Sequence, residues 1–383
     1  MDRRHFLQAT LAAGAASALP TAFAADPLKV AVMIPQSGPG GLFGPSCKAC
    51  AEMAATALNA RGGVLGRKVE LLYGDAGLAP AEAGQAALKL WKGQKAGAVI
   101  GMHDSAVRGA LVGLFKGQVP YLYTPVYEGG ECAKGTYVKG ETPQQQLEPV
   151  IPWLAAERKP TKWYMIGNDY IWGRNTNATA RAYIEKTGAK VVGDEYLPFT
   201  VDNFDASLAR IRDSGADAVL VSLVGGASVT FNKSFASFGL SDKAIRLGTL
   251  IEENTLAGIG FANARNLYSS SGYFANIDTP AAKAFAADYA KANGANAPAL
   301  NGLAESTYEG FLMLEALAKK AGSLDPAKLD AASEGTTYDG PRGAVTVKAR
   351  HVEQDIYVAD VTDKGFRVVK TFPKVGAGQT CKV

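Results

Sequence analysis

The sequence predicts an α/β protein built from two similar lobes, each containing a doubly wound parallel sheet. Short apolar runs that are typical of buried strands alternate with Ala-rich or amphipathic helical stretches. This alternation occurs twice, before and after a polar, Pro-containing stretch at residues 139–149. The chain has 383 residues and 47% hydrophobic content, which is sufficient for two domains with a substantial core.

In the first half, an apolar strand, a glycine-rich loop and an Ala-rich helix follow one another directly. The strand is expected at 28–34, the loop at 35–44 and the helix at 45–61. Further strands are expected at 68–73, at 98–100 and from 121, and further helices at 80–94 and 107–118. The stretch 121–131 begins as a strand and breaks at Pro125, so it predicts a loop at the carboxyl end of a strand.

The second half repeats the pattern and then becomes less regular. Strands are expected at 162–166, 190–196, 218–224, 244–250 and 267–273, with helices between them that include 204–214 and one ending near 187. Later helices are expected at 280–292 and 302–321. The last apolar stretches, 344–348, 354–361 and 366–372, predict antiparallel strands joined by a hairpin turn at Asp363-Lys-Gly365.

Residues 1–24 have the pattern of a signal peptide. Arg3-Arg4 precedes an apolar run at 9–18, and small residues at Ala22 and Ala24 mark a cleavage site. The paired arginines followed by Phe-Leu are typical of a twin-arginine export signal; an ordinary secretory signal is the alternative. No later run reaches the roughly 18 apolar residues of a membrane span. We therefore expect an exported protein located in the periplasm.

Four cysteines would then lie in an oxidising compartment: Cys47, Cys50, Cys132 and Cys381. Four cysteines allow three complete pairings, and the sequence alone does not choose among them. Cys47-x-x-Cys50 lies in a predicted helix without a preceding thioredoxin-like strand, so a structural bridge is favoured over a redox motif. A bridge from Cys132 to Cys381 would tie down the C-terminal tail.

Several functional classes are not supported by the sequence. The net charge of +4 is spread along the chain without a Lys/Arg run, so no nucleic-acid partner is expected. The chain has no G-x-G-x-x-G, no P-loop, no G-x-S-x-G elbow and no zinc-ligand spacing. We therefore predict a binding protein rather than an enzyme, with no cofactor and no metal.

Polar and aromatic residues gather at the predicted carboxyl ends of successive strands. If the two sheets face each other, these residues line one cleft, where small ligands bind. Ser105 and Thr124 could donate to a carbonyl or carboxylate, and Glu252 or Glu253 could accept from an amide or ammonium group. Each residue taken singly also fits a structural role, such as a helix N-cap. The candidate set is His103, Asp104, Ser105, Tyr123, Thr124, Tyr170, Trp172, Glu252 and Glu253.

Five motifs resemble those of a known family. They are Leu58–Arg67, Tyr127-Glu-Gly129 with Glu131-Cys132, Thr142–Gln146, Asp169-Tyr-Ile171 with Arg174, and Tyr273-Phe274 with Ile277–Pro280. Over essentially the whole mature chain, the sequence resembles the type I periplasmic solute-binding proteins of ABC transporters, in the hydrophobic amino acid and amide branch. Within this branch it is most similar to the members that bind urea and short-chain amides.

The resemblance implies a leucine-binding-protein-like fold with a three-strand hinge. Crossovers are implied near 139–148, 272–279 and 343–348. Lobe one would comprise 25–143 with 276–345, and lobe two 144–275 with 346–383. The resemblance also implies ligand contacts from Ser105, Tyr123 and Tyr170, and less firmly from Thr124 and one of the two glutamates.

The sequence departs from the family pattern at His103-Asp104 and at Trp172. The negative charge of Asp104 would favour an amino or amidine group in the ligand. The implied function is that of a monomeric solute-binding component of an ABC importer. Its hinge would close on a small amide, urea or amino-acid-like ligand, which it would deliver to membrane permease subunits. A periplasmic ligand-sensing protein that feeds a signalling receptor is the alternative.

Overall fold

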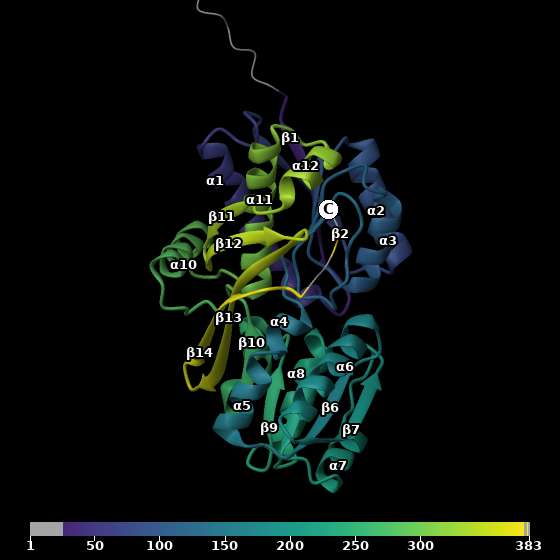
Figure 1. Ribbon diagram of the computed structural model, residues 1–383, viewed down its shortest axis with the longest axis vertical. Helices are drawn as coiled ribbons and strands as arrows, with labels where there is room; N and C mark the ends of the chain where they lie inside the picture. The colour runs from purple at the N-terminus through teal and green to yellow at the C-terminus, as the bar shows by residue number, and fades with distance from the viewer. Residues whose placement is uncertain (1–25, 379–380, 382–383) are drawn as a thin grey trace, which may run out of the picture.

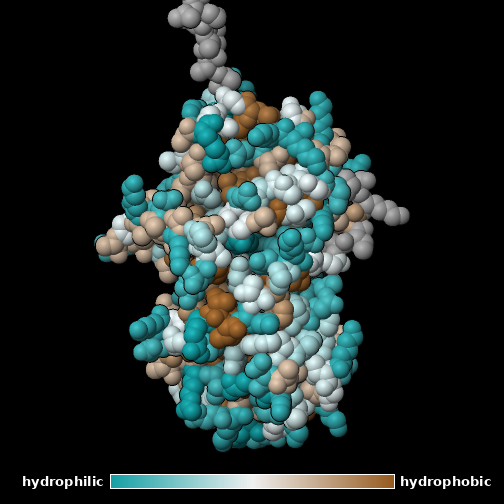
Figure 2. Space-filling model, turned by 60° about the vertical axis from the view of Figure 1, so that its left-hand side comes forward, coloured by the Kyte–Doolittle hydropathy of each residue, from teal (hydrophilic) through white to brown (hydrophobic). Residues whose placement is uncertain are grey.

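The computed structural model describes residues 26–378 and 381, so the predicted signal peptide at 1–24 lies outside the described residues. Two lobes are stacked along the long axis of the molecule (Figure 1). Hydrophilic side chains cover most of the face in Figure 2, and hydrophobic ones form small groups, one of them just below the waist between the lobes. The predicted α/β class with parallel-sheet lobes is confirmed.

Lobe one is built on a parallel sheet with the strand order β2-β1-β3-β4-β5. All four residues of β3 and all three of β4 are buried, because helices cover both faces of the sheet. The strands are β1 (Leu28–Ile34), β2 (Val69–Asp75), β3 (Ala98–Gly101), β4 (Tyr121–Tyr123) and β5 (Thr136–Val138). The helices of this lobe are α1 (Gly44–Ala60), α2 (Pro80–Leu88), α3 (Ser105–Phe115), α10 (Pro280–Asn293), α11 (Gly302–Ala321) and α12 (Pro326–Ser333), with short helical turns η1 (Gly41–Phe43) and η2 (Lys89–Gly93).

Lobe two contains the parallel strands β10-β9-β8-β6-β7, with β13 added antiparallel to β10. These strands are β6 (Lys162–Asn168), β7 (Lys190–Leu197), β8 (Ala218–Ser222), β9 (Ile245–Gly248), β10 (Leu267–Ser271) and β13 (His351–Thr362). The helices are α4 (Pro143–Leu147), α5 (Val150–Arg158), α6 (Ile171–Lys186), α7 (Asp205–Asp213), α8 (Gly225–Ser237) and α9 (Glu253–Ile259), followed by η3 (Phe261–Asn263). The remaining strands, β11 (Thr337–Gly340), β12 (Gly343–Lys348) and β14 (Gly365–Val375), are antiparallel.

The chain passes between the lobes along three segments: the link from β5 to α4, the link from β10 to α10, and strand β13. One end of β13 pairs with β12 through Glu353, and its middle pairs with β10 through Tyr357. The third connection therefore runs along β13 itself. The division of the chain into 25–143 with 276–345 and 144–275 with 346–383 stays a proposal.

A cluster of buried charges joins the three connections at the waist. Arg342 contacts Glu141 on the first connection at 2.7 Å between Nη1 and Oε1, and it also pairs with Glu305 on α11. Lys139 contacts Glu309 at 3.0 Å between Nζ and Oε2. All five side chains are at most 5% exposed, so each charge depends on its partner rather than on water. Burial raises the pKa of the Glu305 carboxyl above its ordinary value.

The same cluster reaches the second and third connections through polar contacts. The backbone N–H of Gly272, just after β10, donates to Glu141 Oε1 at 2.9 Å. Gln354 on β13 accepts from Lys139 at 3.0 Å and from Arg342 at 2.7 Å. A Cβ at Gly272 would lie about 2 Å from the ends of the Glu141 and Arg342 side chains, so any larger residue there would displace this ion pair.

The structure joins Cys132 to Cys381 in a disulfide. Cys47 and Cys50 are unpaired and buried in α1, so the structural bridge favoured for this motif is not formed. Both thiols are packed among apolar side chains of the core, and burial raises the pKa of Cys47 to about 12. They therefore act as small core residues.

We expect Arg342→Met to destabilise the protein strongly, because it leaves the Glu141 and Glu305 carboxylates buried without their cation. A loss of about 3–5 kcal/mol in the free energy of unfolding is expected. Urea unfolding followed by circular dichroism measures it. Arg367→Met, which removes the exposed cation of the Asp360 pair, is the matched control and should stay close to the wild type. Equal effects of the two substitutions would contradict the role of the cluster.

Candidate functional site

A cavity of about 370 Å³ lies between the two lobes. This volume is within the range of small-ligand pockets. Most of the lining residues from both lobes follow the carboxyl ends of parallel strands, which is where ligands bind in such sheets. Lobe one contributes mainly Pro35, Pro39, Phe43, Leu78, Met102, His103, Asp104, Pro125, Val126 and Leu303, and lobe two contributes Tyr170, Phe199, Val224 and Leu250.

Three helices begin at the cavity wall. Their N-cap residues, Asp104 of α3, Tyr170 of α6 and Val224 of α8, all line it. Within the described chain, no side chain caps α6 or α8. The first backbone N–H groups of a helix lack partners within the helix and carry a partial positive charge. The starts of α6 and α8 can therefore donate hydrogen bonds to an anionic ligand group such as a carboxylate.

Asp104 brings a negative charge to the same cavity. One carboxylate oxygen accepts from the backbone N–H of Val107 at 2.9 Å and so caps α3. The walls exclude part of the water, which raises the pKa of the Asp104 carboxyl above its ordinary value. An ammonium group placed here would offset that cost. The cavity thus presents donors for a carboxylate and an acceptor for an amino group.

His103 is a buried, neutral part of the wall. Its Nδ1 lies 3.1 Å from the carbonyl oxygen of Asp104, which can only accept, so Nδ1 carries the proton. Nε2 then accepts from the Tyr121 hydroxyl at 3.0 Å. Burial lowers the pKa of His103 to about 4. The ring therefore adds no positive charge to the cavity at neutral pH.

Three other predicted residues of lobe one lie behind the wall. The Ser105 hydroxyl donates to Glu128 Oε2 at 2.5 Å, and the Tyr123 hydroxyl donates to the His103 carbonyl at 2.7 Å. The Thr124 hydroxyl donates to the Gly101 carbonyl at 3.3 Å. These side chains are buried and do not line the cavity. In this conformation they support the segment that carries His103 and Asp104.

Of the predicted residues in lobe two, one lines the cavity and the other three do not. Tyr170 lines the cavity, and its ring packs on Phe199 with ring centroids 4.8 Å apart. Trp172 is buried behind it, at 6.0 Å between ring centroids. Glu252 caps α9 by accepting from the N–H groups of Asn254 and Thr255, and Glu253 accepts from the Ala275 N–H at 2.7 Å. Neither glutamate lines the cavity.

Sequence reasoning missed most of the apolar lining. Phe43, Phe199, Val224 and Leu250 have apolar side chains, so their residue types alone do not indicate a role in binding. A signal was nevertheless present, because Phe199 and Leu250 each follow a strand by two residues. Positions just beyond strand ends are candidates whatever their chemistry.

Among the described residues, no group of three or more His, Cys, Asp or Glu side chains could hold a metal ion. No helix in the described part of the chain is long and apolar enough to cross a membrane.

Residues 27–366 match the model of the periplasmic binding protein family, and residues 1–20 match a twin-arginine translocation signal sequence. The Leu/Ile/Val-binding protein homolog 6 of Brucella melitensis biotype 1 is 28% identical over 371 residues, which cover 92% of this chain and 93% of that protein.

Solved structures share the fold. A solute-binding protein of an ABC transporter from Rhodopseudomonas palustris HaA2, in complex with p-hydroxybenzoic acid, has a TM-score of 0.82 and 25% identity over 92% of this chain and 99% of that one. The leucine-, isoleucine-, valine-, threonine- and alanine-binding protein of Brucella ovis, in a closed conformation, has a TM-score of 0.80 and 20% identity over 91% of this chain and 95% of that one.

The two buried histidines should make the protein sensitive to acid. Burial lowers the pKa of His103 and of His351 from 6.5 to about 4, so the unfolded chain binds these protons at a higher pH than the folded chain. Stability is then lost as pH falls from 6.5 towards 4. His103→Gln should reduce this loss by on the order of 3 kcal/mol. Urea unfolding at several pH values measures the difference; an imidazole that titrates near 6.5 by NMR would argue against it.

Proposed function

The chain belongs to the periplasmic binding protein family, and from this premise we propose that it captures a small apolar amino-acid-like ligand for an ABC importer. Membership of this family, together with the twin-arginine signal, makes it an exported periplasmic binding protein and not an enzyme. The observation that carries the proposal is the cavity at the strand ends of both lobes. A ligand in that position contacts both lobes at once, so its binding energy favours their closure.

Contacts between the lobes beside the cavity support hinge closure. Asn254 of α9 reaches the Leu42 carbonyl at 3.3 Å and the Ser46 hydroxyl at 3.4 Å across the gap. The start of α8 approaches the opposite loop so closely that a Cβ at Gly225 would lie 2.2 Å from the Pro39 carbonyl oxygen. These contacts belong to a closed arrangement and would separate when the hinge opens. The closed form would then be the one presented to the permease subunits.

The chemistry of the cavity supports an amino acid with an apolar side chain. The uncapped starts of α6 and α8 suit its carboxylate, Asp104 suits its ammonium group, and the apolar walls suit its side chain. Urea and short amides, which the sequence motifs favoured, have little apolar surface to bury against these walls. They are therefore less well matched to the lining.

A second candidate ligand class is an aromatic carboxylate. Phe43, Tyr170 and Phe199 supply aromatic rings to the lining, and such rings can stack with an aromatic ligand. A solute-binding protein of similar fold holds p-hydroxybenzoic acid. Asp104 distinguishes the two classes, since an aromatic acid without an amino group has no positive charge to pair with the Asp104 carboxylate.

The ligand class can be tested with a thermal-shift panel of L-leucine, 4-hydroxybenzoate, urea and acetamide. We expect L-leucine to raise the melting temperature and urea and acetamide to leave it unchanged. A ligand at about 100 times its dissociation constant should stabilise the folded protein by roughly 2.7 kcal/mol. A shift with urea or acetamide alone would restore the amide class, and no shift with any compound would contradict the proposal.

Two aromatic substitutions in lobe two provide the control for this panel. Tyr170→Ala removes a ring from the cavity wall and should abolish most of the shift. Phe261→Ala removes an aromatic side chain that is 44% exposed and lies outside the cavity lining, so it should keep the shift. If both variants lose the shift equally, the ligand binds somewhere other than this cavity.

Asp104→Asn tests the pairing with an ammonium group. Asparagine also caps helices, so α3 should keep its start. Loss of the charge should weaken L-leucine binding by about tenfold or more, because charge-assisted hydrogen bonds contribute about 1.5–3 kcal/mol. Isothermal titration calorimetry gives the affinities. Unchanged L-leucine binding, together with stronger 4-hydroxybenzoate binding, would favour the aromatic-acid class instead.

A further inference from the structure

The C-terminal end of the chain returns from lobe two to lobe one. Strand β14 pairs with β13 beside lobe two and ends at the waist, where the Val375 carbonyl accepts from the Gln145 side chain at 2.8 Å. The Ala377 carbonyl then accepts from the Thr142 hydroxyl at 3.0 Å. Cys381 is bonded to Cys132, which lies in lobe one in the loop between β4 and β5. We call the covalent connection from Gly376 through Cys381 to Cys132 the C-terminal strap; residues 376–378 and 381 of it are described.

We propose that the disulfide makes the C-terminal strap a fourth covalent connection across the hinge, and that Cys132 and Cys381 are positioning residues for ligand binding. This inference rests on the proposed function, since it concerns the closure that the ligand uses. The three connections along the main chain allow one lobe to swing against the other. A further covalent link between the lobes limits how far they can separate.

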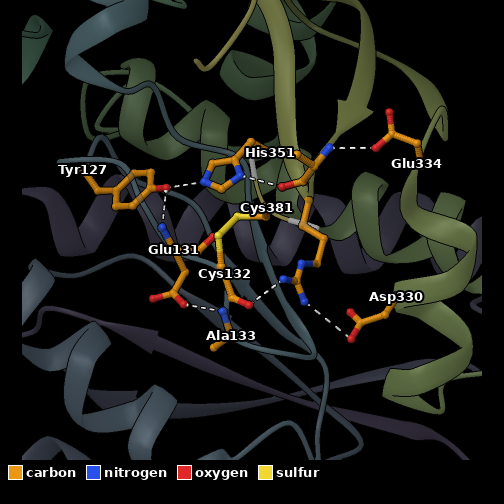
Figure 3. The surroundings of a disulfide bond; sticks show 10 residues. Tyr127, Glu131, Cys132, Ala133, Asp330, Glu334, His351 and Cys381 are labelled. Carbon is orange, nitrogen blue, oxygen red and sulfur yellow. Dashed lines mark hydrogen bonds and ion pairs between the residues drawn. A yellow bond between two sulfur atoms is a disulfide. The ribbon is translucent and has the colours of Figure 1, made fainter. Parts of the chain in front are cut away.

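In lobe one, Cys132 is held by a dense set of contacts (Figure 3). The Arg350 side chain donates to the Cys132 carbonyl at 2.5 Å and lies 3.6 Å from Asp330 of α12. The neighbouring Glu131 accepts from the Ala133 N–H at 2.8 Å, and its own N–H donates to the Tyr127 hydroxyl at 3.3 Å. The strap is therefore fastened to a well-supported part of lobe one.

The loop that carries Cys132 also forms part of the cavity wall. Pro125 and Val126 line the cavity. Glu128 accepts from Ser105 at the start of α3 and from Arg108 at 2.7 Å, and both of these contacts are partly buried. Glu131 binds the same Arg108 at 3.2 Å. The strap thus ends on the loop that supports the His103-Asp104 wall.

Removal of this link should favour the open form. A chain with only three connections can adopt a wider range of open conformations, so the closed population falls. The apparent affinity falls in the same proportion, because the ligand must select or induce a rarer state. The effect is transmitted through the hinge, since neither cysteine lines the cavity.

The first test compares the full chain with a Cys132→Ser/Cys381→Ser variant, using L-leucine and 4-hydroxybenzoate as probes. The variant should bind the better probe at least about fivefold more weakly, the lower end of typical coupling between sites. Small-angle X-ray scattering without ligand should give it a larger radius of gyration. Cys50→Ala, which alters a buried unpaired thiol, is the matched control and should match the wild type in both measurements.

A second variant distinguishes two roles of the disulfide: limiting the hinge through the strap, and simply supporting the loop that carries Cys132. An insertion of about six Gly and Ser residues directly after Gly378 keeps the disulfide but lengthens the chain between Gly378 and Cys381. We expect it to reproduce the weaker binding and the larger radius of gyration. If the insertion behaves as the wild type while the double variant does not, the disulfide supports only the loop and the inference is overturned.

The scattering measurement also keeps the two proposals distinguishable. If neither probe binds the wild type, the proposed ligand class fails, yet a larger radius of gyration of the ligand-free variants would still support the strap. If a probe binds and both variants match the wild type in affinity and in size, the strap proposal fails while the proposed function stands.

Discussion

The buried charge cluster around Arg342 is the constraint on which the arrangement of the two lobes depends. Its members come from the first connection, from α11 and from the turn before β12, and it contacts the second and third connections as well. Charges in such a place must keep their partners, because water cannot replace them. The three connections are therefore held at one point. Each lobe also has a hydrophobic cluster of its own, and a third cluster contains buried residues of both lobes.

The fold was predictable where the strands and helices have clear hydrophobic patterns in the sequence. Strand β1 and helix α11 lie at the residues expected from the sequence, since a buried parallel strand is a continuous apolar run and a long helix has a clear pattern. Strand β5 has only three residues, too few for a periodic signal, and α5 has Pro152 in its first turn, which looks like a breaker.

The candidate site was predictable only in part. Sequence reasoning placed His103, Asp104 and Tyr170 at strand ends, and these three residues line the cavity. It also selected Ser105 and Tyr123, whose hydroxyls are bound by Glu128 and by the His103 carbonyl. Those partners lie about twenty residues away in the sequence, so only the folded structure shows that the hydroxyls are already paired. The unpaired donors at the starts of α6 and α8 are backbone N–H groups. The residue types in the sequence therefore do not indicate them.

The disulfide between Cys132 and Cys381 has a topological consequence beyond the hinge. The two cysteines are 249 residues apart, so the covalent ring that they close contains all the helices and strands of lobe two. In the unfolded state this ring removes conformational entropy equivalent to on the order of 5 kcal/mol in the chain-entropy model. A single cut in a surface loop of lobe two would open the ring without releasing a fragment, because both pieces stay joined through sulfur.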